Sequence, residues 1–148
     1  MQLNPKSPWD EPKIVQFLET SEFPIRLAFL DKANEPLICS LWYQYENGVL
    51  WCASHKNSFL VSQLKNNKKI GFEVSTNDYP YKGVRGKAEV ELSMLNTEST
   101  LSKLIAKYLG SGNAQLSSWL LSRADDEYVI KITPKTVNSW DFSHRMKK

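Results

Sequence analysis

The loop from Ser54 to Ser58 carries the side chains of this sequence best suited to hold a phosphate group. It reads Ser-His-Lys-Asn-Ser and stands between an apolar, strand-like segment and a short helical segment. Hydroxyl groups donate hydrogen bonds to phosphate oxygens, and a lysine adds a charge-assisted bond. Free amide groups at the start of a helix also favour an anion. The sequence therefore predicts a site for a phosphorylated ligand.

Two strand-like segments position this loop. Residues 37–45 and 49–53 have the composition of strands, and Glu46-Asn47-Gly48 between them predicts a tight hairpin turn, because Asn and Gly tolerate positive φ. Ser58 is placed to cap a short helix over residues 59–64. Edge amides of such strands would be available to a bound ligand.

In the rest of the chain, apolar residues recur either at every second position, as in a strand, or about every 3.6 residues, as in a helix. Residues 10–20, 97–109 and 114–122 predict helices, and residues 25–30, 70–74 and 83–92 predict strands. Residues 128–132 and 137–142 predict two last strands, joined by a turn at Thr133-Pro134-Lys135. This hairpin-rich order differs from the regular alternation of a parallel α/β sheet. We expect a mainly β protein, an antiparallel barrel with peripheral helices.

Length and composition limit the classes of protein to consider. The chain has 148 residues, 41% of them hydrophobic and 24% charged, which suits a single domain over residues 1–148. Residues 1–11 are expected to form an N-terminal extension and residues 143–148 a basic tail. A net charge of +3 gives no reason to expect nucleic acid. No run of about 20 apolar residues predicts a membrane span, and no secretory signal is recognisable, so we expect a cytoplasmic protein.

Cysteine and histidine are scarce. Cys39 and Cys52 are two cysteines in a chain of this size, which is a poor disulfide framework, so free and mainly buried thiols are expected. His55 and His144 are the two histidines, and neither has a spaced acidic partner. We therefore expect no metal site.

Three stretches at characteristic spacings resemble a known family. They are residues 36–43 (Pro-Leu-Ile-Cys-Ser-Leu-Trp-Tyr), residues 50–54 (Leu-Trp-Cys-Ala-Ser) before a helix, and residues 81–90 (Tyr-Lys-Gly-Val-Arg-Gly-Lys-Ala-Glu-Val). Together with the order of elements over roughly residues 12–142, they resemble the pyridoxamine 5'-phosphate oxidase-like, FMN-binding split barrels. The resemblance implies a six-stranded antiparallel split β-barrel.

The same resemblance implies a flavin-dependent oxidoreductase acting on a small-molecule substrate that the sequence does not identify. Such proteins usually hold FMN at the interface of a homodimer. By position, the amides of Cys39, Ser40 and Leu41 would face the edge of the ring. The ribityl chain and phosphate would be surrounded by Ala53, Ser54, His55, Lys56 and Ser58. Arg85 would be the second cation, and Trp140 or the loop with Tyr79 and Tyr81 would cover the ring from the partner subunit.

One departure from the family pattern keeps alternatives open. Members that hold FMN commonly carry Lys or Arg two residues after the serine that opens the short helix, whereas here Ser58 is followed by Phe59 and Leu60. A deazaflavin- or haem-binding relative, or a cofactor-free binding or regulatory barrel, are the alternatives. In that last case Lys56 and Arg85 are solvated charges, His55 is an exposed loop residue, and Trp140 packs in a core or an interface.

Overall fold

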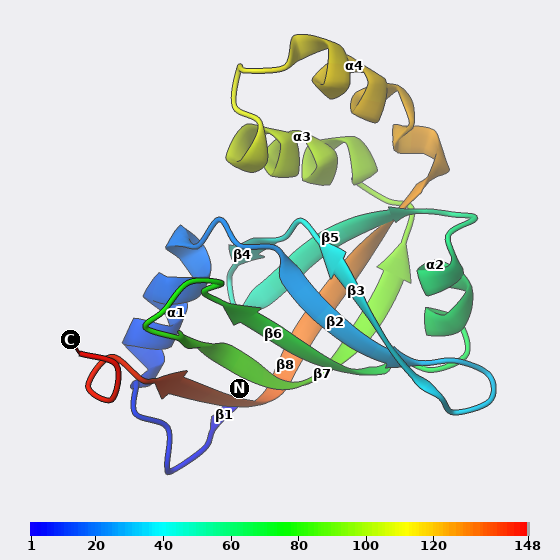
Figure 1. Ribbon diagram of the computed structural model, residues 1–148. Helices are drawn as coiled ribbons and strands as arrows, with labels where there is room; N and C mark the ends of the chain where they lie inside the picture. The colour runs from blue at the N-terminus through cyan, green and yellow to red at the C-terminus, as the bar shows by residue number, and fades with distance from the viewer. Residues whose placement is uncertain (148) are drawn as a thin grey trace.

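A computed structural model describes residues 1–147, and within them eight strands form one sheet that curls into a split barrel (Figure 1). The strands run in the order β3-β2-β6-β7-β8-β5-β4, all neighbours being antiparallel, while β1 pairs with β8 in parallel. Their bounds are β1 Gln2–Leu3, β2 Ile25–Leu30, β3 Pro36–Leu41, β4 Gln44–Glu46, β5 Val49–His55, β6 Lys69–Ser75, β7 Lys82–Ser93 and β8 Glu127–Asp141.

The helices lie around the barrel. They are α1 Glu11–Thr20, α2 Phe59–Leu64, α3 Thr97–Tyr108 and α4 Ala114–Ser122, with a 3₁₀ turn, η1, at Ala124–Asp126. In Figure 1, α3 and α4 stack above one end of the sheet, while α1 and α2 flank the barrel on opposite sides. None of the helices in the described part of the chain is long and apolar enough to cross a membrane.

Three of these helices start where the sequence predicts a helix, and each of the three begins with a side-chain cap. Asp10 Oδ1 accepts a bond of 3.0 Å from the Lys13 amide, and Ser58 Oγ accepts one of 3.1 Å from the Val61 amide. Asn113 caps α4 in the same way, through the Leu116 amide at 2.9 Å. Each cap satisfies an amide that would otherwise lack a partner.

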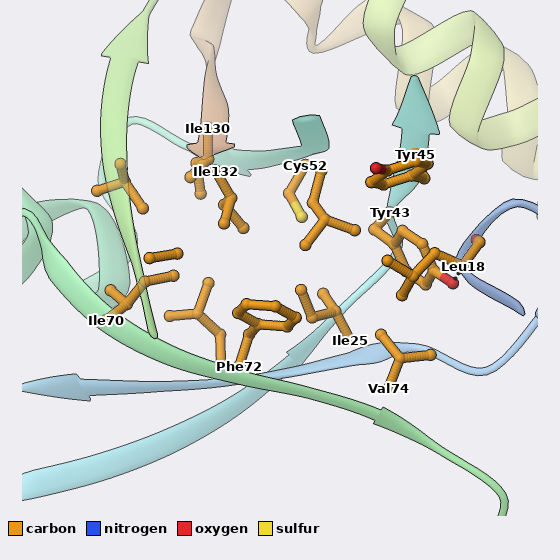
Figure 2. Close-up of a cluster of buried hydrophobic side chains, with 14 of the residues drawn as sticks. Leu18, Ile25, Tyr43, Tyr45, Cys52, Ile70, Phe72, Val74, Ile130 and Ile132 are labelled. Atoms are coloured by element: carbon orange, nitrogen blue, oxygen red, sulfur yellow. Dashed lines mark hydrogen bonds between the residues drawn. The ribbon is translucent and has the colours of Figure 1, made fainter. Parts of the chain in front are cut away.

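The barrel interior is filled by the apolar side of every long strand. Figure 2 shows Ile25, Phe72 and Ile132 converging on the core, with Cys52 among them. From α1, Leu18 closes one side of this core. Tyr43 is fully buried there, and its hydroxyl donates a bond of 2.8 Å to the Leu18 carbonyl, so its one polar group is satisfied.

The predicted hairpin after β4 is confirmed, because Asn47 and Gly48 both have positive φ, at 52° and 78°. The predicted strand over residues 37–45 is instead broken at Trp42 and Tyr43 into β3 and β4. The short β1 and β4 bring the number of strands to eight rather than six.

The prediction of two last strands joined by a turn is wrong, because β8 runs unbroken from Glu127 to Asp141. Its pairing with β7 shifts register between Lys87 and Ala88, opposite Pro134 and Thr136. A proline cannot donate to the ladder, and a bulge is one of the places in a sheet that tolerates it. The signal read as a turn therefore marks an irregularity inside one long strand.

The two halves of β8 have different neighbours on the side away from β7. Its first half pairs with β5, from Glu127 opposite His55 to Ile132 opposite Leu50, and its second half pairs with β1 at Thr136 and Val137. Trp9 anchors the N-terminal segment beyond β1: it is buried, its amide bonds Ser139 Oγ at 3.1 Å, and its indole bonds Asp141 at 3.1 Å. The first residues are thereby part of the sheet surface.

Candidate functional site

Residues 53–58, which we name the β5–α2 corner, end strand β5 and begin helix α2. Ser54 Oγ donates a bond of 2.8 Å to Ser58 Oγ. Ser58 Oγ also accepts the Val61 amide as the cap of α2. Because this oxygen accepts both bonds, the hydroxyl proton of Ser58 remains to be donated to a ligand. Ala53 lies opposite Val129 in the ladder with β8.

Lys56 is engaged by an acidic residue. Its Nζ lies 2.7 Å from Asp126 Oδ1, and its main-chain amide donates a bond of 2.7 Å to the Asp126 carbonyl. The hydrogen bond between the two side chains raises the pKa of Lys56 and lowers that of Asp126. At neutral pH the charge of Lys56 is therefore already met by a carboxylate of the protein.

His55 and Glu127 face each other across the β5–β8 ladder. His55 Nδ1 accepts the Asn57 amide at 3.1 Å, which fixes the loop after β5. Glu127 is buried, its Oε1 lies 3.4 Å from Arg123 Nη2, and burial raises its pKa. The corner thus contains acidic as well as basic groups.

The candidate residues on β3 lie on a strand that has β2 as its one neighbour among the described residues. Cys39 and Leu41 pack against the core, whereas Ser40 lies outward opposite Arg26. Both cysteines are free thiols. Burial raises the pKa of both thiols, and the nearby charge of a Cys39 thiolate would raise that of Cys52 further. Both sulfurs therefore remain protonated at neutral pH.

A large groove runs over the outer face of strands β2, β6, β7 and β8, and we name it the outer groove. Its volume is about 870 Å³, within the range of ligand sites in proteins. Small residues, Ala28 and Gly71, form part of its floor, and Ile38 on β3 stands at its edge with 73% of its surface exposed. Its lining residues are Gln2, Leu3, Asn4, Pro5, Arg26, Ala28, Ile38, Gly71, Phe72, Glu73, Arg85, Gly86, Lys87, Thr136, Val137 and Asn138.

A row of polar side chains crosses this groove in register. Arg26 lies opposite Glu73, Glu73 opposite Arg85, and Arg85 opposite Asn138. The Arg85 guanidinium stands 5.0 Å from the centre of the Trp140 ring, which is the spacing of a cation–π contact. Oδ1 of Asn138 is buried and has no hydrogen-bond partner among the described residues.

The structure brings the sequence-predicted residues together in two separate groups. Ser54 lies opposite Tyr128 on β8, and Arg85 lies opposite Asn138, ten positions further along the same strand. Ten residues of extended strand span roughly 30 Å. No residue of the β5–α2 corner lines the outer groove. Arg85 and Trp140 of one protomer are therefore out of reach of a ligand held at its own corner.

Three further residues belong to these surroundings and were missed from the sequence: Asp126, Asn138 and Glu73. Asp126 is 70 positions from Lys56, and no spacing pattern connects them. Asn138 and Glu73 occupy outward positions of strands, where polar residues are ordinary, and pairing register alone places them beside Arg85. No group of three metal-ligating side chains exists in the part of the chain that the structure describes.

Comparisons with known proteins identify the fold. No protein-family model matches the sequence, and no curated protein matches it at a significant level. Among solved structures, a conserved hypothetical protein from Mycobacterium tuberculosis is similar over 100% of this chain and 95% of its own, with a TM-score of 0.81 and 16% identity.

Two further structures carry functional names. An F420 reductase is similar over 83% of this chain and 94% of its own, with a TM-score of 0.68 and 19% identity. A putative pyridoxamine 5'-phosphate oxidase from Listeria innocua is similar over 90% of this chain and 98% of its own, with a TM-score of 0.66 and 15% identity. At these identities the likeness concerns the fold, and it confirms the resemblance seen in the sequence: the chain has the split-barrel fold of the pyridoxamine 5'-phosphate oxidase-like proteins.

Proposed function

We propose that this protein is an FMN-binding oxidoreductase that acts on a small organic substrate as a homodimer. The split-barrel fold, the names of two similar structures as a reductase and an oxidase, and the donors at the β5–α2 corner support this function. Two free cysteines are typical of a reducing compartment, which supports a cytoplasmic location.

The corner supplies groups that suit the phosphate end of the cofactor. Ser58 has a hydroxyl proton to donate, and Lys56 and His55 stand beside it on the same loop. On the edge strand β3, those amides among Cys39, Ser40 and Leu41 that point away from β2 would bond the rim of the flavin ring. Arg85 and Trp140 would come from the second copy, where they already form a cation–π pair able to cover an aromatic ring.

The separation of the two groups along β8 is the observation that carries the homodimer. The candidate phosphate-binding groups lie at the β5–α2 corner, whereas Arg85 and Trp140 lie at the outer groove, so two associated copies could bring one group of each kind to the same ligand. Ile38 is an exposed apolar residue at the groove edge, and Glu73 stands between Arg26 and Arg85. A surface with an apolar projection, small floor residues and charges of both signs can be self-complementary about a two-fold axis.

In this assignment the flavin supplies the electron-transfer chemistry when it is bound. The chain's own residues bind the phosphate, orient the ring against β3 and exclude water with the partner's surface. No side chain needs to act as an acid or a base for this role.

The test is a visible absorbance spectrum of the purified protein, followed by titration with FMN monitored by fluorescence quenching. Flavin bands and saturation near one FMN per subunit would support the proposal. A colourless protein that leaves FMN fluorescence unchanged would contradict it and favour a cofactor-free barrel. A Soret band would identify haem as the cofactor in place of FMN, and the spectrum of a deazaflavin would identify a deazaflavin.

A further inference from the structure

Asp126 lies where a ligand phosphate would have to bind if it used Lys56. Its carboxylate holds the Lys56 ammonium at 2.7 Å, and the two side chains are 49% and 44% exposed respectively. Exposed ion pairs exchange readily with solvent ions and ligands. Asp126 therefore competes with a ligand phosphate for the cation that the corner offers.

The charges around Asp126 also oppose the binding of a phosphate. Residues 123–127 contain Arg123 and three carboxylates, those of Asp125, Asp126 and Glu127. Arg123 is directed to the buried Glu127 at 3.4 Å, so it does not neutralise Asp126 by a direct ion pair. A ligand phosphate at Ser58 would displace one carboxylate from Lys56 and would remain near that carboxylate afterwards. Like charges at such short range oppose binding.

We propose that Asp126 is a specificity-determining residue that weakens the binding of phosphate-bearing ligands at the β5–α2 corner. The inference rests on the proposed function, within which it sets the preference between FMN and riboflavin, the same flavin without its phosphate. Wild-type protein then discriminates little in favour of FMN, because the phosphate gains Lys56 only by expelling Asp126.

The geometry provides a substitution that changes charge and leaves the backbone intact. The main-chain carbonyl of Asp126 accepts the Lys56 amide at 2.7 Å, and this bond does not involve the carboxylate. Asp126→Asn removes the negative charge and keeps the side-chain size and the main-chain bond. Asp125→Asn is the matched control, because Asp125 is exposed, adjacent in sequence and absent from the ion pairs of the described residues.

The experiment measures FMN and riboflavin affinities of the wild type and both variants by fluorescence quenching at low salt. Removing a unit charge a few ångströms from a phosphate dianion in a water-like medium corresponds to about a tenfold gain in affinity. We expect Asp126→Asn to bind FMN about tenfold more tightly, with riboflavin affinity unchanged. Asp125→Asn should change FMN affinity less than threefold, and high salt should shrink the gain.

A second measurement keeps this inference separate from the flavin proposal. Inorganic phosphate is titrated into the wild type and Asp126→Asn, and amide chemical shifts of Ser58 and Val61 report its binding at the corner. Tighter phosphate binding by the variant, in a protein that binds neither flavin, would support the role of Asp126 and overturn the proposed function. If the protein binds flavin, and the wild type and Asp126→Asn have the same affinity for each of FMN, riboflavin and phosphate, the role of Asp126 is overturned and the proposed function stands.

Discussion

Lys107 of α3 donates a hydrogen bond of 2.8 Å to the Tyr43 carbonyl, and its ammonium stands 3.7 Å from the centre of the Tyr43 ring. The next residue, Tyr108, stacks on Trp42 with ring centres 5.1 Å apart and planes 6° from parallel. The last turn of α3 is thereby fastened to the junction between β3 and β4.

This relationship predicts a particular dependence of stability on pH. Burial lowers the pKa of Lys107 to about 8, below its usual value of 10.5. Between these two pH values the native protein binds fewer protons than the unfolded chain, so the contribution of Lys107 to the free energy of unfolding rises with pH and is smallest below pH 8. The rise is expected to be about 1–3 kcal/mol, because the group is only partly buried.

The measurement compares urea unfolding of the wild type and Lys107→Met from pH 7.5 to 10.5. The difference in unfolding free energy should shift in favour of the wild type as pH rises, while thiols and tyrosines that titrate in the same window largely cancel in the comparison. Lys103→Met, on the exposed side of the same helix, serves as the control. Parallel curves for the wild type and Lys107→Met would contradict the assignment.

Gly86 is predicted to be intolerant of alanine. A Cβ at this position would collide with the Thr136 carbonyl and lie 2.9 Å from the Phe72 ring, both in the packed sheet. We expect Gly86→Ala to lower the free energy of unfolding by about 2–3 kcal/mol, since neither neighbour is a flexible side-chain end. Gly71→Ala is the control, because its nearest contacts would be at 3.7 and 3.8 Å. Urea denaturation measures both, and equal stabilities would show that the strand relaxes around the methyl group.

The cofactor assignment predicts the effect of removing both candidate cations. Lys56→Ala combined with Arg85→Ala should weaken FMN binding at least tenfold and leave the dimer folded, because Lys56 would bond the phosphate and Arg85 of the second copy would lie over the flavin ring. Fluorescence quenching measures affinity, and circular dichroism checks the fold. Lys135→Ala, whose partner is Glu89 on the sheet surface, is the control. Unchanged affinity in the double variant would remove these residues from the site.

Mixing the two single variants tests whether the cations serve one ligand from different subunits. If Lys56 of one protomer and Arg85 of the other share a site, a mixed dimer has one site without either cation and one site with both. Subunit exchange between Lys56→Ala and Arg85→Ala proteins should therefore create a class of sites with wild-type affinity. The absence of such a class after confirmed exchange would place both cations elsewhere.

The outer groove predicts how the dimer is disrupted. Ile38→Asp places a charge at the apolar edge of the proposed interface, and desolvating that charge should weaken association about 100-fold. Sedimentation velocity over a range of concentrations measures the change. Leu95→Asp is the matched control, because Leu95 is 76% exposed and does not line the groove. Equal dissociation by both variants would argue against this face as the interface.

Features determined by a few neighbouring residues were predictable from the sequence. The helix that starts at Asp10, the cap at Ser58 and the turn at Asn47 and Gly48 depend on local hydrogen bonds and on φ preference, and the structure confirms them. The continuity of β8 through Pro134 was not predictable in this way. It depends on a bulge against β7, and the tolerance of that bulge is a property of the assembled sheet.

The candidate site likewise contains features that depend on neighbouring residues and features that depend on the tertiary structure. The corner residues from Ala53 to Ser58 lie together because they are consecutive in the chain. The contact between Arg85 and Trp140 results from their places on paired strands. The ion pair of Lys56 with Asp126 joins a loop to a 3₁₀ turn far along the chain, and neither residue carries a pattern that indicates the other. Charge competition at a site of this kind becomes visible only with the tertiary structure.

The central position of β8 determines when the barrel can form during synthesis. Strands β1 and β5 emerge early, yet both pair with residues between Glu127 and Asp141. Until the ribosome has released that segment, β5 has the short β4 as its ladder partner and β1 has none among the described strands. A chain that ends before residue 127 is therefore expected to leave the apolar faces of β5 and β7 without their native packing.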